Sequence, residues 1–218
     1  MLRMFMPPLK DFELIIEDLK MHLETPNLVA PAKKVKLDQM ENTFNGYKVI
    51  KHLGRGMQGC TVLARKAVPG KNGLIDFGLK VIKVAETKNA AIADFARMEA
   101  VFLFIVNHKY IVNFFETFEY ENLVCTVIQY CHEGDILKKK GKLSEANIKD
   151  IVAMCLFALH QIHQYRIVHR DIKMENVLVN NEFMVQIADF GIARAIGDKY
   201  APFGKTTRGS ELYMSPQV

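Results

Sequence analysis

The sequence predicts an α+β fold, in which an antiparallel sheet with one helix precedes a mainly helical, loop-rich part. Three observations predict this order. Between residues 47 and 84, short runs of alternating or β-branched residues are separated by glycine- and proline-containing turns, which is typical of hairpins. Residues 90–104 and 145–164 instead carry apolar residues at helical spacing, and Ser144 is a suitable N-cap. From 168 to 187, short apolar runs alternate with tight loops.

The composition limits the possible partners. The 218 residues carry a net charge of +5 without one long basic block, so we expect no nucleic-acid partner. The longest apolar run within a predicted helix, 151–159, is too short to span a bilayer, so we expect no membrane insertion. The four cysteines form no Cys-x-x-Cys pair, which favours reduced thiols and a cytoplasmic, or also nuclear, location.

Residues 1–46 are predicted to form an N-terminal extension. Apolar residues between Leu9 and Leu23 recur at helical spacing among acidic residues, which predicts a short amphipathic helix. Proline and polar residues up to 42 then indicate a linker. Within it, a one-part nuclear import signal, or simply a solvated basic patch, is formed by Lys33, Lys34 and Lys36.

A glycine-rich turn separates the first two predicted strands. Its glycines let a hairpin approach a triphosphate closely, with backbone N–H groups facing the phosphate oxygens. A plain hairpin is the alternative on this motif alone. A strand rather than a helix follows the turn, which argues against a dinucleotide site. The candidate ATP-binding residues here are Gly54, Arg55, Gly56, Met57, Gln58 and Gly59.

A lysine on a following strand can serve the same ligand. Lys80 can reach the α- and β-phosphates if another group fixes its flexible stem. Glu99, on the predicted helix, can hold it as an ion pair, although each residue taken singly is more often a surface charge. Lys83 lies on the same strand, but strand alternation points it to the opposite face.

Two further motifs supply polar groups at fixed offsets. In the loop that begins at His169, Asp171 can orient a substrate hydroxyl and accept its proton, and Lys173 can neutralise the γ-phosphate during transfer. Asn176 can ligate magnesium. Asp189 follows a buried strand in Asp-Phe-Gly, where a carboxylate is costly unless it is paired or binds metal. Magnesium held across the β- and γ-phosphates would satisfy it.

In their order and context, these four motifs resemble those of the protein kinase family. The resemblance covers 47–218 and implies a bilobal kinase fold, with the N-lobe and hinge at 47–130 and part of the helical C-lobe at 131–218. It implies phosphoryl transfer from ATP to serine or threonine hydroxyls of protein substrates, with ATP and Mg²⁺ as cofactors. The implied catalytic residues are Asp171, Lys80 and Lys173, and the implied metal ligands are Asn176 and Asp189.

The resemblance adds contacts to ATP. Residues 127–131 are similar to the hinge between the lobes, with Ile128 as gatekeeper and backbone groups of Gln129 and Cys131 as partners of adenine. Asp135 falls where the family has a ribose contact. The remaining implied ATP-binding residues are Leu53, Thr61, Gly78, Glu99 and Leu178.

The resemblance also implies specificity and regulation. A lysine two residues after the catalytic aspartate is the family's serine/threonine mark, and Ser210 falls where a residue shapes the substrate pocket. Arg170 directly precedes Asp171, and in the family such an arginine often binds a phosphorylated residue of the activation loop. Thr206 lies where that phosphosite usually falls, so we expect Thr206 to be the switch.

Three positions depart from the family's pattern. Thr61 replaces a valine over adenine, and Gly78 replaces an alanine whose methyl is worth at most about 0.8 kcal/mol, so we expect weakened ATP binding. Gln217 replaces a glutamate that closes the activation segment.

A typical kinase domain would continue for roughly a hundred residues beyond Val218. We therefore expect the outer apolar face of the 145–164 helix to lack its cover and the isolated chain to be unstable. The alternative function is a truncated, non-catalytic, kinase-like nucleotide-binding or interaction fragment.

Overall fold

The computed structural model describes residues 43–55, 59–67, 73–83, 90–120, 123–180, 184–195 and 210–214. Several sequence predictions lie outside this part of the chain. They are the amphipathic helix and basic cluster before residue 43, the glycine-loop residues Gly56, Met57 and Gln58, the expected phosphosite Thr206, and Gln217.

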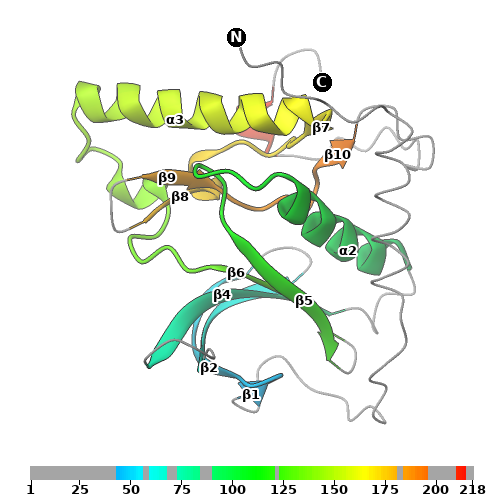
Figure 1. Ribbon diagram of the computed structural model, residues 1–218. Helices are drawn as coiled ribbons and strands as arrows, with labels where there is room; N and C mark the ends of the chain where they lie inside the picture. Colours follow the sequence, from blue (N-terminus) through cyan, green and yellow to red (C-terminus); the bar gives the residue numbers. More distant parts are fainter. Residues whose placement is uncertain are drawn as a thin grey trace.

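A six-stranded antiparallel sheet forms one end of the molecule (Figure 1). Its strand order is β1-β2-β3-β4-β6-β5. The strands are β1 (Thr43–Phe44), β2 (Tyr47–Arg55), β3 (Gly59–Ala67), β4 (Leu74–Lys83), β5 (Phe114–Tyr120) and β6 (Leu123–Gln129). The strand β4 pairs with β3 along almost its whole length, from Leu74 opposite Ala67 to Ile82 opposite Gly59.

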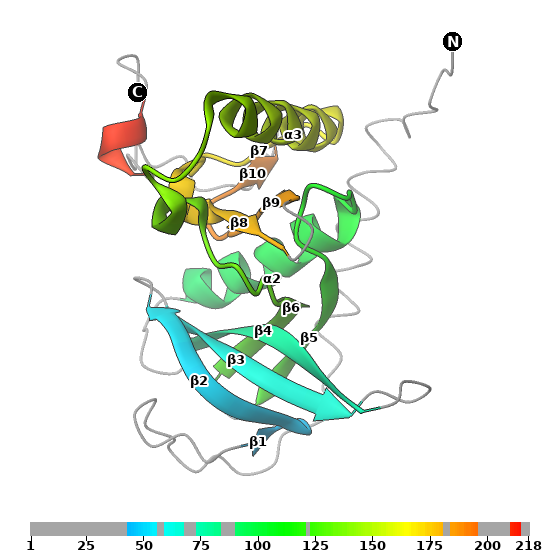
Figure 2. The ribbon, with the colours of Figure 1, turned by 90° about the vertical axis from the view of Figure 1, so that its left-hand side faces the viewer.

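The helix α2 (Ala90–Ile105) packs on β5 and β6 and lies between the sheet and the other end of the molecule (Figure 1). That other end contains α3 (Glu145–Gln164) and two small antiparallel sheets, β8 (Val177–Val179) with β9 (Val185–Ile187) and β7 (Ile167–Val168) with β10 (Arg194–Ala195). Within the described residues, this end also contains the short 3-10 helices η2 (Ile136–Lys139), η3 (Met174–Asn176) and η4 (Glu211–Tyr213). The predicted bilobal arrangement is confirmed (Figure 2).

The helices predicted at 90–104 and 145–164 are present as α2 and α3, and α3 begins where its cap requires. Ser144 Oγ accepts a hydrogen bond from the backbone N–H of Asn147 at 3.2 Å, and Asn147 Oδ1 accepts one from the backbone N–H of Ser144 at 3.1 Å. This reciprocal capping box satisfies two backbone donors at the boundary of the helix. No helix within the described ranges is long and apolar enough to cross a membrane.

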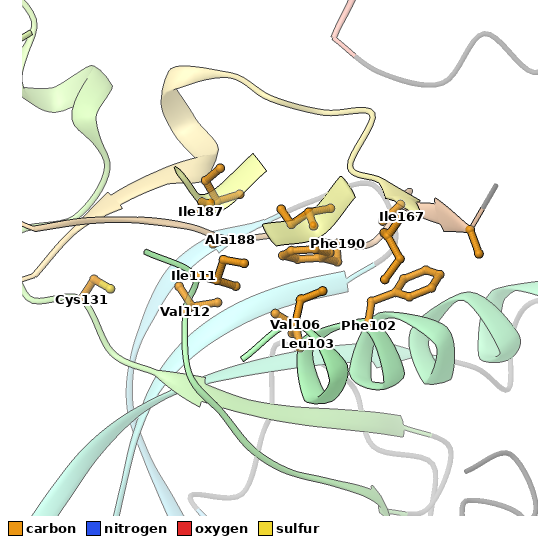
Figure 3. Packing of buried hydrophobic residues seen from close by; sticks show 14 residues of the cluster. Phe102, Leu103, Val106, Ile111, Val112, Cys131, Ile167, Ile187, Ala188 and Phe190 are labelled. Atoms are coloured by element: carbon orange, nitrogen blue, oxygen red, sulfur yellow. The ribbon is translucent and has the colours of Figure 1, made fainter. Parts of the chain in front are cut away.

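The largest hydrophobic cluster lies between the two ends of the molecule. Phe190, which is 1% exposed, packs there with Phe102 and Leu103 of α2 and with Ile167 (Figure 3). A second cluster lies on the sheet and includes Tyr47 and Leu79. The segment that follows Asp189 is therefore held by packing against α2, at the boundary where the two lobes meet.

One face of α3 remains uncovered within the described part of the chain. The helix buries Ala158 and Ile162, but its opposite side exposes Ile148, Val152, Leu156 and Phe157. Leu156 is 60% exposed. Large apolar side chains adjacent on one helix face form a patch of the kind that promotes association. Among the described residues, this apolar face of α3 is therefore exposed.

Candidate active site

The glycine-rich turn connects two long paired strands. Gly54 pairs with Thr61, and Arg55 pairs with Cys60, so β2 and β3 are antiparallel neighbours up to the residues that flank the glycine-rich segment. A strand follows the turn, as predicted. Leu53 is exposed on β2, and Thr61 lies opposite Lys80 on β4. The hairpin therefore brings the predicted glycine loop and the predicted phosphate-binding lysine to neighbouring strands.

Lys80 contacts two carboxylates that come from distant parts of the sequence. Its Nζ atom lies 2.7 Å from both Glu99 Oε1 and Asp189 Oδ1. Burial alone would lower the pKa of Lys80, but these two carboxylates outweigh burial and raise the pKa above its ordinary value. Lys80 is therefore a fixed cation. The predicted ion pair between Lys80 and Glu99, which is 2% exposed, is present.

Gly191 lies against the same charged group. A Cβ atom at this position would lie 3.1 Å from Asp189 Oδ1 and 3.2 Å from Lys80 Nζ. The backbone N–H of Gly191 also donates to Asp189 Oδ1 at 3.3 Å. The glycine of Asp-Phe-Gly thus leaves room for the lysine and holds the carboxylate toward it. Burial opposes ionisation of Asp189, but Lys80 outweighs burial and holds the pKa of that carboxyl below its ordinary value.

Asp171 is at the centre of a hydrogen-bond network. Its Oδ2 accepts from Asn176 Nδ2 at 2.9 Å and lies 2.7 Å from Lys173 Nζ, while its Oδ1 accepts from Ser210 Oγ at 3.0 Å. Lys173 Nζ also donates to Ser210 Oγ at 2.8 Å. Burial opposes ionisation, but the bonds from Lys173, Ser210 and Asn176 outweigh it and lower the pKa of Asp171. Asp171 is therefore ionised and oriented at neutral pH.

His169 supports this loop from the core. Its ring lies 4.7 Å from the Phe190 ring, measured between centroids, and the side chain is 1% exposed. Nδ1 accepts from the backbone N–H of Asp171 at 3.3 Å, which leaves Nε2 to donate to the Ala188 carbonyl at 3.0 Å. Burial lowers the pKa of His169, so the ring is a neutral imidazole with one defined tautomer.

The backbone is left-handed at two residues of the site. Arg170 has a φ of 67° and Asp189 has a φ of 65°. Non-glycine residues in this region cost of the order of 1 to 3 kcal/mol and persist only where the surroundings hold them. Here the surroundings are the Lys80 pair of Asp189 and the bond from Arg170 Nε to the Ile192 carbonyl at 2.6 Å. The expected contact of Arg170 with a phosphate on Thr206 lies outside the described residues.

The predicted hinge, residues 127–131, begins within β6 and continues two residues beyond its end at Gln129. The backbone N–H of Gln129 donates to the Asn113 carbonyl at 2.8 Å, and Cys131 is buried in the cluster between the lobes. Gly78 pairs with Ile128, and a Cβ at Gly78 would lie 3.1 Å from Ile128 Cγ1. The space that an alanine methyl would occupy is therefore already filled by the predicted gatekeeper.

Asp135, the expected ribose contact, is engaged within the protein. Its Oδ1 accepts from the backbone N–H of Lys138 at 3.1 Å, and its Oδ2 lies 2.8 Å from Lys138 Nζ. The residue also forms an isolated bridge with Leu178, the other predicted ATP contact on this side. A ribose hydroxyl that bonds to the Asp135 carboxylate would either displace the Lys138 ammonium group or bind beside it. The Lys138 side chain is largely exposed.

One contact of Ser210 and one further residue of the site were not predicted from the sequence. Ser210 was assigned to the substrate pocket, but its bond to Asp171 joins positions 39 residues apart. Gln186 is a buried side chain on β9 that bonds to the hinge, and it was not singled out at all. The available signal for Gln186 was a polar residue inside the apolar run Met184–Ala188.

The fold and these contacts define a bilobal, protein-kinase-like protein, and comparison with known families gives the same result. Residues 47–218 match the family described as the protein kinase domain. The chain therefore belongs to the protein kinase family.

Its relatives include kinases from fungi, animals and plants. It is 28% identical over 193 residues to "Carbon catabolite-derepressing protein kinase" of Candida tropicalis, covering 86% of this chain and 30% of that protein. It is 31% identical over 181 residues to "Serine/threonine-protein kinase Nek3" of Mus musculus, covering 80% and 34%. It is 30% identical over 184 residues to "SNF1-related protein kinase catalytic subunit alpha KIN12" of Arabidopsis thaliana, and the match covers 83% of this chain and 36% of that protein. The chain thus spans about a third of the length of these relatives.

Proposed function

We propose that this protein is a serine/threonine kinase that transfers the γ-phosphoryl group of ATP to hydroxyl groups of protein substrates. The observation that carries this proposal is the position of Lys80, 2.7 Å from both Glu99 and Asp189. A fixed cation beside a carboxylate, next to a glycine-rich hairpin, is suited to hold a triphosphate and its metal ion. The serine/threonine kinases among the relatives support the same activity.

The residues present fit a magnesium ion. Asn176 uses its Nδ2 atom to donate to the backbone oxygen and the carboxylate of Asp171, which leaves its amide oxygen as the atom that can bind a cation. The carboxylate of Asp189 supplies a second oxygen. Magnesium commonly binds one or two protein oxygens together with phosphates and water. When bound, the ion would neutralise charge on the phosphates.

The chemistry assigned to Asp171 is proton acceptance and orientation. The substrate hydroxyl oxygen attacks the γ-phosphorus, the bond from γ-phosphorus to the β,γ-bridging oxygen breaks, and ADP leaves. The hydroxyl proton passes to the Asp171 carboxylate. Lys173, at 2.7 Å from Asp171, also places positive charge where the γ-phosphoryl oxygens pass.

The proposal is tested by separating nucleotide binding from phosphoryl transfer in the full-length protein. In Asp171→Asn, we expect transfer from radiolabelled ATP to a serine-containing protein to fall by at least about a hundredfold. The dissociation constant of a fluorescent ADP analogue should stay within about twofold, because the described bonds of the Asp171 carboxylate are to Lys173, Asn176 and Ser210 rather than to Lys80, which we assign to the α- and β-phosphates. Unchanged transfer would remove Asp171 from the mechanism. Nucleotide binding without transfer in the wild-type protein would support the non-catalytic alternative.

The location and boundaries of the protein are proposed on separate grounds. We propose that it acts in the cytoplasm, with access to the nucleus, because Cys60, Cys125, Cys131 and Cys155 are free thiols. We also propose that the N-lobe and hinge extend over 47–130 and that an extension precedes them. Imaging of the tagged full-length protein tests the location, and limited proteolysis tests the boundary at residue 46.

A further inference from the structure

Gln186 is a buried amide surrounded by hydrogen-bond partners from two other segments. It is 3% exposed and lies on β9 between Val185 and Ile187, which are buried apolar residues. Its Nε2 atom lies 3.2 Å from Gln129 Oε1 and 3.3 Å from each of two backbone carbonyl oxygens. The thiol of Cys131 donates to its Oε1 atom at 3.5 Å. The two carbonyls belong to Lys109 and Ile111.

The orientation of this amide follows from its surroundings. Three oxygen atoms surround Nε2, and oxygen acceptors require a donor, so the nitrogen atom must be on this side. The thiol faces Oε1, and burial raises the pKa of Cys131 to about 11, which keeps it protonated and able to donate. Both ends of the Gln186 side chain are therefore satisfied, and each contacts the hinge.

Backbone bonds also join the segment before β5 to the hinge, where Gln129 donates to the Asn113 carbonyl at 2.8 Å, and to β9. Ile187 donates to the Tyr110 carbonyl at 2.9 Å and accepts from Val112 at 3.0 Å. Figure 3 shows the side chains of Ile111, Val112 and Ile187 close together, with Cys131 to one side. These bonds join β9 to the segment between α2 and β5, while the hinge side chains are reached by Gln186. Asp189, whose carboxylate is proposed to bind magnesium, follows Gln186 by three residues in sequence. Gln186 therefore links the hinge to the segment that carries this carboxylate.

We propose that Gln186 is a positioning residue for nucleotide binding, which holds the hinge at a fixed place relative to β9 and the segment before β5. This inference rests on the proposed function, since it concerns the same nucleotide site. Gln186 does not contact the reacting groups in this arrangement. Its loss should loosen the adenine-binding backbone of Gln129 and Cys131 while leaving the Asp171 network intact. The expected signature is weaker nucleotide binding with little change in the rate of transfer at saturation.

A purely structural role makes a different prediction, and Val185 provides the matched control. Val185 is 1% exposed on the same strand but packs in another cluster, with Ile136, Val177 and Val179. Gln186→Met keeps the size of the side chain and removes its hydrogen bonds, whereas Val185→Ala removes apolar packing. If Gln186 only stabilised the fold, variants with equal loss of thermal stability would show equal loss of nucleotide affinity.

The experiment measures binding of a fluorescent ADP analogue, and KM for ATP with kcat, on the full-length protein. For Gln186→Met, we expect the dissociation constant and KM to rise about tenfold, with kcat within about twofold. For Val185→Ala, we expect a comparable decrease in melting temperature and a dissociation constant within about twofold of wild type. Equal dissociation constants in Gln186→Met and wild type would overturn the inference. A wild-type protein that binds no nucleotide would instead count against the proposed function.

A double-mutant cycle with Gln129 tests the contact itself, and Gln129→Met alone tests it from the hinge side without changing the buried Gln186. Gln129 is only partly buried, so Gln129→Met is expected to fold, and it keeps the backbone groups that face adenine. We expect it to weaken nucleotide binding by a similar factor. In the double variant, the loss should be smaller than the product of the two single losses, because both changes break the bond between Gln186 and Gln129. Losses that simply multiply would show that Gln186 does not act through the Gln129 side chain, which would overturn its assignment as the residue that positions this part of the hinge.

Discussion

The variant Gly78→Ala tests whether Ile128 fills the space next to Gly78 at the predicted nucleotide site. The sequence alone predicts that Gly78→Ala improves ATP binding, because it restores an apolar contact worth at most about 0.8 kcal/mol. In the structure, the new Cβ would lie 3.1 Å from Ile128 Cγ1 and 3.6 Å from Ile128 Cδ1. Carbon atoms prefer separations of about 3.5 to 4.0 Å, so Ile128 would have to move.

The cost of overpacking and the gain from the new methyl contact together decide whether Gly78→Ala weakens or strengthens ATP binding. Overpacking of this kind typically costs about 1 to 3 kcal/mol, which exceeds the largest gain from the methyl contact. Ile128 is the predicted gatekeeper, and its displacement would be directed at the nucleotide site. We therefore expect Gly78→Ala to bind ATP no more tightly than wild type and up to about tenfold more weakly.

The same change has the opposite expected effect when Ile128 is shortened. In an Ile128→Ala background, the colliding Cγ1 atom is absent, so the methyl group of Gly78→Ala should fit and tighten ATP binding by about threefold. Isothermal titration with ATP and magnesium on the four proteins of this cycle measures both effects. A severalfold gain in affinity from Gly78→Ala alone would refute the reasoning, since it would mean that Ile128 does not occupy this space.

Three further outcomes follow from the packing of the described residues. Gly191→Ala puts a methyl carbon 3.1 Å from Asp189 Oδ1 and 3.2 Å from Lys80 Nζ, so kcat/KM for ATP should fall about tenfold or more, and a wild-type value would contradict the crowding. His169→Gln keeps a donor and an acceptor but cannot titrate. Burial lowers the pKa of His169 from 6.5, so protonation of this ring favours the unfolded state. The contribution of His169 to the free energy of unfolding is therefore fully present above pH 6.5 and is lost as the pH falls below that value. Denaturant unfolding from pH 5 to 7.5 should show this slope, at most about 1.4 kcal/mol per pH unit, reduced in His169→Gln. Leu156→Lys replaces a 60% exposed apolar side chain, so light scattering of the 218-residue chain should decrease while its melting temperature stays the same.

The sequence predicts the elements and charged residues of the site well, because these depend on local chemistry. Ser144 predicts the start of α3 because an exposed hydroxyl at that place satisfies a backbone donor. Lys80 and Glu99 could be paired because their strand and helix were both recognisable from the pattern. The pairing of Asp189 with the same lysine was not predicted, since it depends on how the chain after β9 folds back against α2.

Neutral contacts are harder to predict because they depend on which atoms lie nearby. Gly78 was interpreted as a lost methyl contact, and only the three-dimensional packing places Ile128 in that space. In the same way, glutamine at 186 has no charge or motif to mark it, although a polar residue in a buried strand is costly unless its amide is satisfied. That cost is the physical signal: Gln186 can occupy β9 only because the hinge and the segment before β5 supply its partners. A buried polar side chain inside an apolar strand is therefore the place in this sequence where a functional contact could have been sought without a known motif.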